Sequence, residues 1–373
     1  MEHIRKLTVD IGTRVTGSDG ERKAAEYIRE QFAASGYVAE IAPFTFEGDR
    51  FRTTSISTGA AVVDALIMSG SGGGRVRASA VFVGLADADG IAGRDLTGKV
   101  AIANRGTLQF RQKADNVRKA GAVALIVVND REGELSGNVG AGTGIPVVGV
   151  TKEAGAALRA AADAGTAFTL AAPAGSTSTG LNIIARPSTG DACRLVVGGH
   201  MDTVPGAPGA HDNASGTAQV IELARAFAAD GLDAGICFVA FSGEESGLHG
   251  SEAYARDARL KNQLPIIMVN IDASGVGRRM QLIGDAELTR QALAVAQQMG
   301  LEAETTELAA GFGSDHQSFA AEGVPVLYFA SDELGKFHTS GDTIDTINPD
   351  LIERGGDVEY AVLKRLLRQT TRP

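Results

Sequence analysis

Apolar runs and helical patterns alternate along the chain from residue 181 onward. Short apolar runs rich in β-branched residues predict buried strands at Leu181–Ala185, Arg194–Gly199, Gly235–Phe241, Ile266–Ile271, Met280–Ile283 and Pro325–Phe329. Apolar residues at helical spacing predict helices near Ala214–Ala229, Leu248–Arg256, Ala286–Met299, Asp315–Ala321 and Pro349–Gln369. This alternation predicts an α/β domain whose mainly parallel mixed sheet is covered by helices on both faces.

The N-terminal residues predict further elements of the same domain. Ser18 and Glu21 have the spacing of a capping box, and apolar side chains recur on one face of the helix that should follow. Val38–Ile41 and Phe44–Phe46 then read as strand.

Residues 55–174 have a different pattern. Short strands separated by glycine-rich turns are expected at Ala61–Met68, Ala78–Val83, Lys99–Asn104, Ala122–Val128 and Ile145–Val150. Helical patterns interrupt them at Phe110–Ala120 and Lys152–Ala162. We therefore predict one α/β domain made of residues 1–52 and 176–373, into which a β-rich module of residues 55–174 is inserted.

Composition narrows the class of protein. The 373 residues are 44% hydrophobic and 21% charged, as in ordinary globular proteins, and the net charge of −10 gives no electrostatic reason to expect nucleic acid or an anionic membrane as partner. No apolar run reaches membrane-spanning length and no signal peptide is evident, so we expect a cytoplasmic protein, or a secreted one if a leader has been removed. Cys193 and Cys237 lie in apolar runs and are expected to be buried free thiols.

Imidazole and carboxylate side chains gather where the predicted strands end. His200 ends one run and Asp202 follows it, a spacing that lets a carboxylate hold the second nitrogen of a metal-bound imidazole. Glu244 and Glu245 follow the next strand. Because adjacent side chains point in different directions, one of these acids can bind a metal while the other accepts a proton.

Three more candidates come from other segments. Asp212 precedes a helix, where it could be an ordinary N-cap or could bridge two cations. Asp272 and His338 each follow a further strand. Two histidines and three carboxylates (His200, Asp212, Glu245, Asp272 and His338) suit two Zn²⁺ ions that share one carboxylate, although Co²⁺ or Mn²⁺ can occupy the same ligands. Such a pair of ions catalyses hydrolysis.

These motifs, taken together, resemble the co-catalytic zinc exopeptidases, which include bacterial leucyl aminopeptidases, aminopeptidase Y and glutamate carboxypeptidase. The matching segments are H-M-D (200–202), D-N-A-S-G (212–216), G-E-E-S-G-L-H-G-S (243–251), N-I-D (270–272), S-D-H-Q-S-F (314–319) and F-H-T (337–339), in the family's order. The resemblance implies that Asp212 bridges the zinc ions and that His200 and Glu245 bind separate ions. It also implies Glu244 as general base and Asp202 as the residue that orients His200.

Two other histidines are also considered for the site. Some relatives carry an oxyanion-stabilising tyrosine where this chain has Gly311-Phe312-Gly313-Ser314. His316 could replace it, or the second zinc could suffice. His211 is expected to be an exposed loop histidine.

The inserted module resembles a protease-associated domain. The matching segments are F-R-Q-K-A-D-N-V-R-K-A-G-A-V-A-L-I-V-V-N (110–129) and I-P-V-V-G-V (145–150). Modules of this kind resemble lids or substrate-gating elements and supply no catalytic groups.

The leading hypothesis is a di-zinc aminopeptidase acting on peptides, of unknown oligomeric state. A carboxypeptidase on the same metals would need cations for the substrate carboxylate, and Arg278 and Arg279 are the nearest candidates. A receptor-like binding protein is disfavoured because such relatives have lost metal ligands, whereas every ligand position is filled here. A glutaminyl cyclase is disfavoured because the chain contains no tryptophan.

Overall fold

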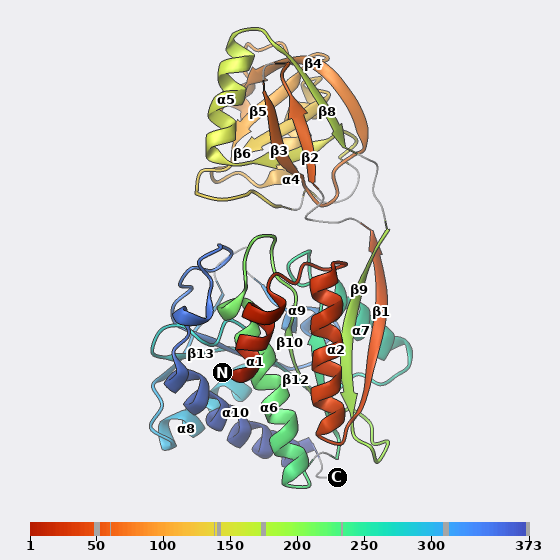
Figure 1. The fold of residues 1–373 in the computed structure, drawn as a ribbon, viewed down its shortest axis with the longest axis vertical. Coiled ribbons are helices and arrows are strands. Elements are labelled where there is room, and N and C mark those ends of the chain that lie inside the picture. The colour runs from red at the N-terminus through yellow and green to blue at the C-terminus, as the bar shows by residue number, and fades with distance from the viewer. Residues whose placement is uncertain are drawn as a thin grey trace. The chain divides into compact units, whose positions relative to one another are not determined.

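The computed structural model describes residues 1–47, 53–59, 61–137, 139, 143–172, 177–232, 234–308 and 313–370. Within these ranges the chain divides into two compact units (Figure 1). The first unit contains Met1–Thr45 and Thr179–Pro373, and the second contains Phe46–Ser178.

An eight-stranded sheet forms the centre of the first unit. Its strands, in spatial order, are β1 (Val38–Glu47), β9 (Thr177–Arg186), β11 (Ile236–Phe241), β10 (Leu195–His200), β12 (Ile267–Ile271), β15 (Val326–Ser331), β13 (Met280–Gly284) and β14 (Ala303–Thr305). The four central strands β11, β10, β12 and β15 are parallel, whereas β9 and β13 run antiparallel to their central neighbours. The predicted mainly parallel mixed sheet is confirmed.

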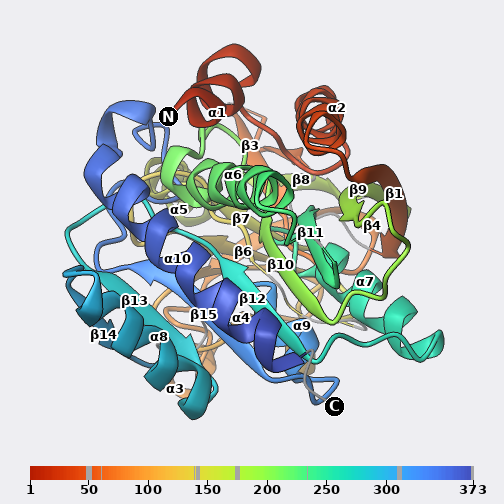
Figure 2. The same cartoon turned by 90° about the horizontal axis from the view of Figure 1, so that it is seen from below.

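Helices cover both faces of this sheet. Side chains such as Val197, Phe238 and Val269 share one core with α2 (Asp19–Ala34), α6 (Ser215–Ala229), α8 (Ala286–Gln298) and α10 (Pro349–Thr370). Val196, Val239 and Met268 point the other way and pack with α7 (His249–Leu260) and α9 (His316–Ala320). Alternation along each strand thus explains why the runs are apolar throughout. Figure 2 shows α6 and α10 lying next to each other.

The N-terminal predictions hold with one difference. The side chain of Ser18 accepts a hydrogen bond from the Glu21 amide and caps α2, as its spacing predicts. The two strands predicted around Pro43 form the single strand β1. It lies at the edge of the sheet, where proline is tolerated because one side of the strand needs no hydrogen-bond donors. The remaining short elements are α1 (Glu2–Arg5), η3 (Ile344–Thr346) and two π-helical turns, η1 (Lys6–Ile11) and η2 (Ala210–Ala214).

A closed barrel forms the second unit. Its strands, in order around the barrel, are β2 (Thr53–Ser57), β3 (Val62–Ile67), β7 (Val147–Val150), β6 (Ala124–Val128), β5 (Val100–Asn104), β4 (Gly74–Phe82) and β8 (Ala167–Ala172). Its helices are α3 (Ala88–Ile91), α4 (Phe110–Lys119) and α5 (Lys152–Asp163). Ile56 of β2 and Phe168 of β8 lie in the barrel core, although neither strand is predicted by the sequence pattern. In the described part of both units, no helix combines the length and apolarity needed to cross a membrane.

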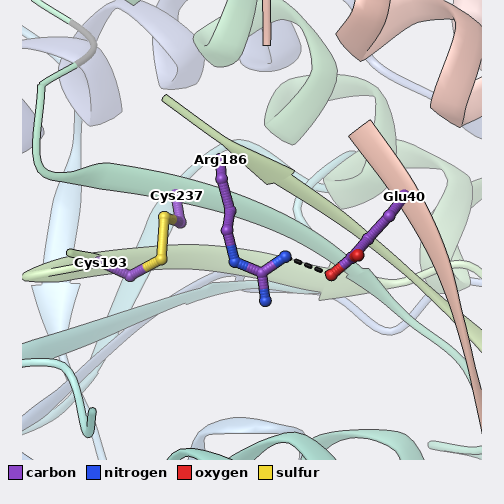
Figure 3. The surroundings of a disulfide bond; sticks show 4 residues. All are labelled: Glu40, Arg186, Cys193 and Cys237. Carbon is purple, nitrogen blue, oxygen red and sulfur yellow. Dashed lines mark hydrogen bonds and ion pairs between the residues drawn. A yellow bond between two sulfur atoms is a disulfide. The ribbon is translucent and has the colours of Figure 1, made fainter. Parts of the chain in front are cut away.

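The expectation of free thiols is wrong, because Cys193 and Cys237 form a disulfide (Figure 3). Cys237 lies on β11 opposite Val196 of β10, so the pairing of these strands brings Cys193 to it, with 5.3 Å between the Cα atoms. The two cysteines are 44 residues apart in sequence, and only the sheet order makes them neighbours.

Reducing this disulfide should destabilise the first unit by about 2–4 kcal/mol, because the unfolded chain regains the freedom of a long loop. That loss corresponds to a fall in Tm of about 5–10 °C. Thermal unfolding of the reduced and oxidised protein measures it, and the Cys193→Ala/Cys237→Ala variant should match the reduced protein or fall below it. Equal Tm values for the oxidised and reduced protein would contradict a structural bond.

Glu359 is a buried carboxyl group in α10. It accepts a hydrogen bond from Gln219 Nε2 (3.2 Å), and burial raises the pKa of Glu359 to about 8. When the pKa of a carboxyl group is higher in the folded than in the unfolded state, its protonation stabilises the folded state. This stabilisation is complete below the pKa of the unfolded state and is lost as the pH rises through the pKa of the folded state.

Glu359→Gln should therefore unfold less readily than the wild type above pH 8, by a few kcal/mol, and lose that advantage below about pH 4.5. Denaturant unfolding at pH 4.5, 7 and 9 tests this, with Glu353→Gln on the exposed side of the same helix as control. A difference that does not grow with pH would show that burial does not hold Glu359 protonated.

Candidate metal centre

Three neighbouring parallel strands bring most of the candidate residues together. His200 ends β10, Glu244 and Glu245 follow β11, and Asp272 follows β12. Because parallel neighbours end on the same side of a sheet, these side chains meet at one edge. Asp212 joins them from the turn η2, which precedes α6. His338 comes from the loop that follows β15.

Asp212 faces both histidines. Its Oδ1 lies 3.0 Å from His200 Nε2, and its Oδ2 lies 3.0 Å from His338 Nε2. Asp272 Oδ1 lies 3.3 Å from His200 Nε2, and Glu245 Oε2 lies 3.0 Å from His338 Nε2. The five candidate ligands thus form two groups that share one carboxylate.

Two sets of three side chains, with Glu244 instead of Asp212 beside His200 and Asp272, are close enough together to hold one cation each. In one group, ligand atoms of His200, Asp272 and Glu244 lie within 4.8 Å of one another, and in the other those of Asp212, Glu245 and His338 do. His200 Nε2, Asp212 Oδ2 and Asp272 Oδ1 are buried without a hydrogen-bond partner in the described part of the chain. Leaving such atoms buried is costly unless a bound ion compensates them, so the donor set fits a pair of metal ions.

The charges of the cluster act on one another. Burial opposes ionisation of Asp212, but the adjacent imidazoles of His200 and His338 outweigh it and hold the pKa of Asp212 far below its usual value. Burial would also lower the pKa of His338, yet Glu245 and Asp212 raise it to about 10. Because an imidazole binds a metal in its neutral form, metal binding must release any proton that these two histidines carry.

Asp202 lies on the other side of His200. The carboxylate Oδ1 of Asp202 is 3.5 Å from His200 Nδ1, whose other close contact is the Asp202 carbonyl oxygen at 3.2 Å. The same carboxylate accepts hydrogen bonds from the Glu244 and Glu245 amides and from Thr16 Oγ1 (3.0 Å). One side chain thus links His200 to the segment that carries both glutamates.

Both units match known protein families. Residues 182–363 match Peptidase family M28, and residues 61–158 match the PA domain. The aminopeptidase YwaD of Bacillus subtilis is 30% identical to this chain, over 99% of this chain and 85% of its own length. The chain belongs to peptidase family M28.

Solved structures of similar proteins agree with this assignment. The M28 chain resembles the zinc aminopeptidase BSAP from Bacillus subtilis, with a TM-score of 0.86, 29% identity, and coverage of 98% of this chain and 93% of that one. It also resembles an aminopeptidase from Aneurinibacillus sp. strain AM-1, with a TM-score of 0.75 and 30% identity over 98% and 92% of the two chains. The predicted resemblance to zinc exopeptidases with an inserted protease-associated domain is confirmed.

Two further histidines of this M28 peptidase are buried. His211 is wrongly predicted as exposed: it is 1% exposed, and its Nδ1 accepts a hydrogen bond from the Gly275 amide. His316 is also buried and stacks on Tyr328, and burial lowers the pKa of His316 to about 4. In the described ranges it forms no ion pair with the five candidate ligands. Gly311 and Phe312, of the turn that lacks a tyrosine, lie outside the described residues.

Sequence reasoning missed three residues around the candidate metal centre of this M28 chain. Thr16 bonds to Asp202, Asp342 accepts from the Asp212 amide, and Arg14 bonds to the loop between His200 and Asp212. Asp342 ends the segment G-K-F-H-T-S-G-D, four residues after His338, and this spacing was its only signal. Arg14 and Thr16 precede the capping box of α2 and lie nearly two hundred residues from the motifs. Only the folded chain brings them to the site.

Proposed function

We propose that this M28 peptidase is an aminopeptidase that binds two zinc ions through His200, Asp212, Glu245, Asp272 and His338. The observation that carries the proposal is the position of Asp212, with one carboxylate oxygen 3.0 Å from each histidine. When bound, the ions lower the pKa of water and polarise the scissile carbonyl of a peptide.

Glu244 is proposed as the general base. Its side chain is 13% exposed, whereas that of His200 is 1% exposed, and its Oε2 lies 4.0 Å from His200 Nε2. Burial raises the pKa of Glu244 well above its usual value, against the opposing effect of His200. A carboxylate at this position is suited to take a proton from the attacking water and to return it to the leaving amine. The Asp202 carboxylate contacts both His200 and the Glu244 amide, so it fixes their positions relative to each other.

Two observations favour an aminopeptidase over a carboxypeptidase. The similar proteins described above are named aminopeptidases. Arg279, one of the candidate cations for a substrate carboxylate, instead pairs with Asp332 (3.1 Å) and Glu304 (3.4 Å).

Peptides with free and acetylated N-termini distinguish the two activities. We expect the zinc-loaded protein to release the first residue of free peptides and to leave N-acetylated peptides intact. Cleavage of the acetylated series from its C-terminal end would show a carboxypeptidase instead.

We also propose that the protein works in an oxidising compartment. The Cys193–Cys237 disulfide supports this, because such bonds persist in secreted proteins and are rare in the cytosol. The protein is isolated without reductant from culture medium and from cells, and its free thiols are titrated after denaturation. The fraction that has peptidase activity, called the functional pool, should contain no free thiol. Two free thiols in that pool would favour the cytoplasm.

A further inference from the structure

Arg14 is fully buried in the first unit, and among the described residues its guanidinium donates only to backbone carbonyl oxygens. These acceptors, at 2.7–3.1 Å, belong to Leu7, Gly12, Met201, Pro208 and Gly209. The last three lie in the loop that joins His200 to Asp212. A planar guanidinium with five donors suits such a fixed set of acceptors, whereas a lysine ammonium has only three donors.

Asp342 binds the next part of the same loop. Whereas Arg14 donates to carbonyl oxygens, Asp342 accepts hydrogen bonds from backbone amides. Its Oδ1 accepts from the His211 amide at 2.8 Å and its Oδ2 from the Asp212 amide at 3.1 Å. The backbone oxygen of Asp342 accepts from the Ala210 amide at 3.2 Å. The side chain is 1% exposed, so these bonds are shielded from water.

Gly209 lies between the two sets of contacts. Its φ of +63° favours glycine, and a Cβ atom there would lie 2.4 Å from the Asp212 carbonyl oxygen and 3.2 Å from Arg14 Nη2. Residues 209–212 are therefore held at both ends. The Gly209 carbonyl accepts from the Arg14 guanidinium, and the next amides donate to Asp342. Within the described chain, this segment ends in the carboxylate that faces both histidines.

Arg14 also supplies charge. Burial lowers the pKa of Arg14 to about 10, against the opposing effects of Asp202, Asp342, Asp212 and Glu245. The guanidinium is therefore positive at neutral pH and offsets part of the negative charge that the cluster of acids concentrates.

We propose that Arg14 and Asp342 are positioning residues that fix the bridging carboxylate of Asp212 between the two metal sites. The inference rests on the proposed di-zinc function. Both Asp212 oxygens must keep their places at once, so a small shift of residues 209–212 lengthens at least one of the two ligand contacts. Groups that hold metal ligands in place typically contribute 10–100-fold to metal affinity.

Arg14→Lys and Asp342→Asn test the proposal. Lysine keeps the charge but loses two donors, and asparagine offers one oxygen to two amides. We expect zinc affinity, measured by competition with a chelator, to fall about 10–100-fold in each variant. We expect kcat to fall while KM stays within a few fold, and the visible absorption bands of the Co²⁺-loaded protein to shift. Because the residues act on one segment, the double variant should lose less than the sum of the single losses.

Arg22→Lys and Asp350→Asn, on exposed helix positions, are the matched controls and should bind zinc like the wild type. Thermal unfolding of the metal-depleted variants separates loss of folding from loss of positioning. If Arg14→Lys does not fold, Asp342→Asn decides alone. Folded variants with wild-type zinc affinity and an unchanged Co²⁺ spectrum would overturn the inference. A wild-type protein that binds fewer than two ions would instead overturn the proposed function.

Discussion

Replacing Glu244 by glutamine should lower kcat by about 10²–10⁴-fold while the protein still binds two zinc ions. Glutamine has nearly the same shape but cannot accept the proton of the attacking water. The five proposed ligands remain, and Asp202 can still bind the amide of residue 244, because that contact involves only the backbone. Metal analysis and steady-state kinetics on aminoacyl p-nitroanilides measure the two quantities separately.

Glu252→Gln, on the exposed side of α7, is the control for loss of a carboxylate outside the cluster. It should retain wild-type kcat and zinc content. A Glu244→Gln protein that keeps activity within a few fold would show that another group serves as the base. Loss of one zinc ion from that protein would show that Glu244 is a ligand, as its distance from His200 and Asp272 permits.

Replacing Asp212 by asparagine should have a comparable effect for a different reason. The amide keeps one oxygen and turns an NH₂ group toward the other histidine, so the side chain can no longer bridge two cations. We expect fewer than two zinc ions per chain and a fall in kcat of about 10³-fold, since bound metal supplies several kcal/mol of transition-state stabilisation. Metal analysis and kinetics on the same preparation test both.

Asp191→Asn, at an exposed position, should change neither quantity. The metal-depleted wild type should be inactive and should recover on addition of zinc. An Asp212→Asn protein that binds two ions and turns over normally would mean that Asp212 is an ordinary helix-terminal acid. The amides of residues 211 and 212 should still reach Asp342 in this variant, so a loss is attributable to the side chain.

The sequence predicts the first unit well because its candidate ligands come directly after the apolar runs that form the strands. Buried parallel strands give continuous apolar runs, and each candidate ligand after such a run can be expected at the same edge of the sheet. His200, Glu244 and Asp272 were therefore predictable as neighbours. His338 was predictable only as a member of the set, because nothing in its own segment indicates the long reach to Asp212.

What the sequence does not reveal depends on contacts between distant segments. The disulfide requires that β10 and β11 be neighbours, and neither cysteine shows this locally. Arg14 donates to backbone carbonyl groups, which every residue has, so the sequence does not show which residues it binds. His211 looks like a loop residue until Asp342 is found to bind its amide.

The barrel shows a second kind of limit. β2 is T-T-S-I-S, with a single buried apolar residue, so its pattern is too weak to predict a strand. β8 (A-F-T-L-A-A) has alternating burial and completes the barrel between β2 and β4. Closure of the barrel, not local propensity, explains both strands.

The most direct test of the account is a stepwise titration of zinc into the metal-depleted protein, with bound metal and the rate on a panel of aminoacyl p-nitroanilides measured at each step. The contacts of Asp212 with both His200 and His338 predict that binding saturates at two ions per chain and that the rate rises from near zero to its full value over that range. Full activity without metal, or with saturation at a single ion, would contradict a two-metal centre bridged by Asp212.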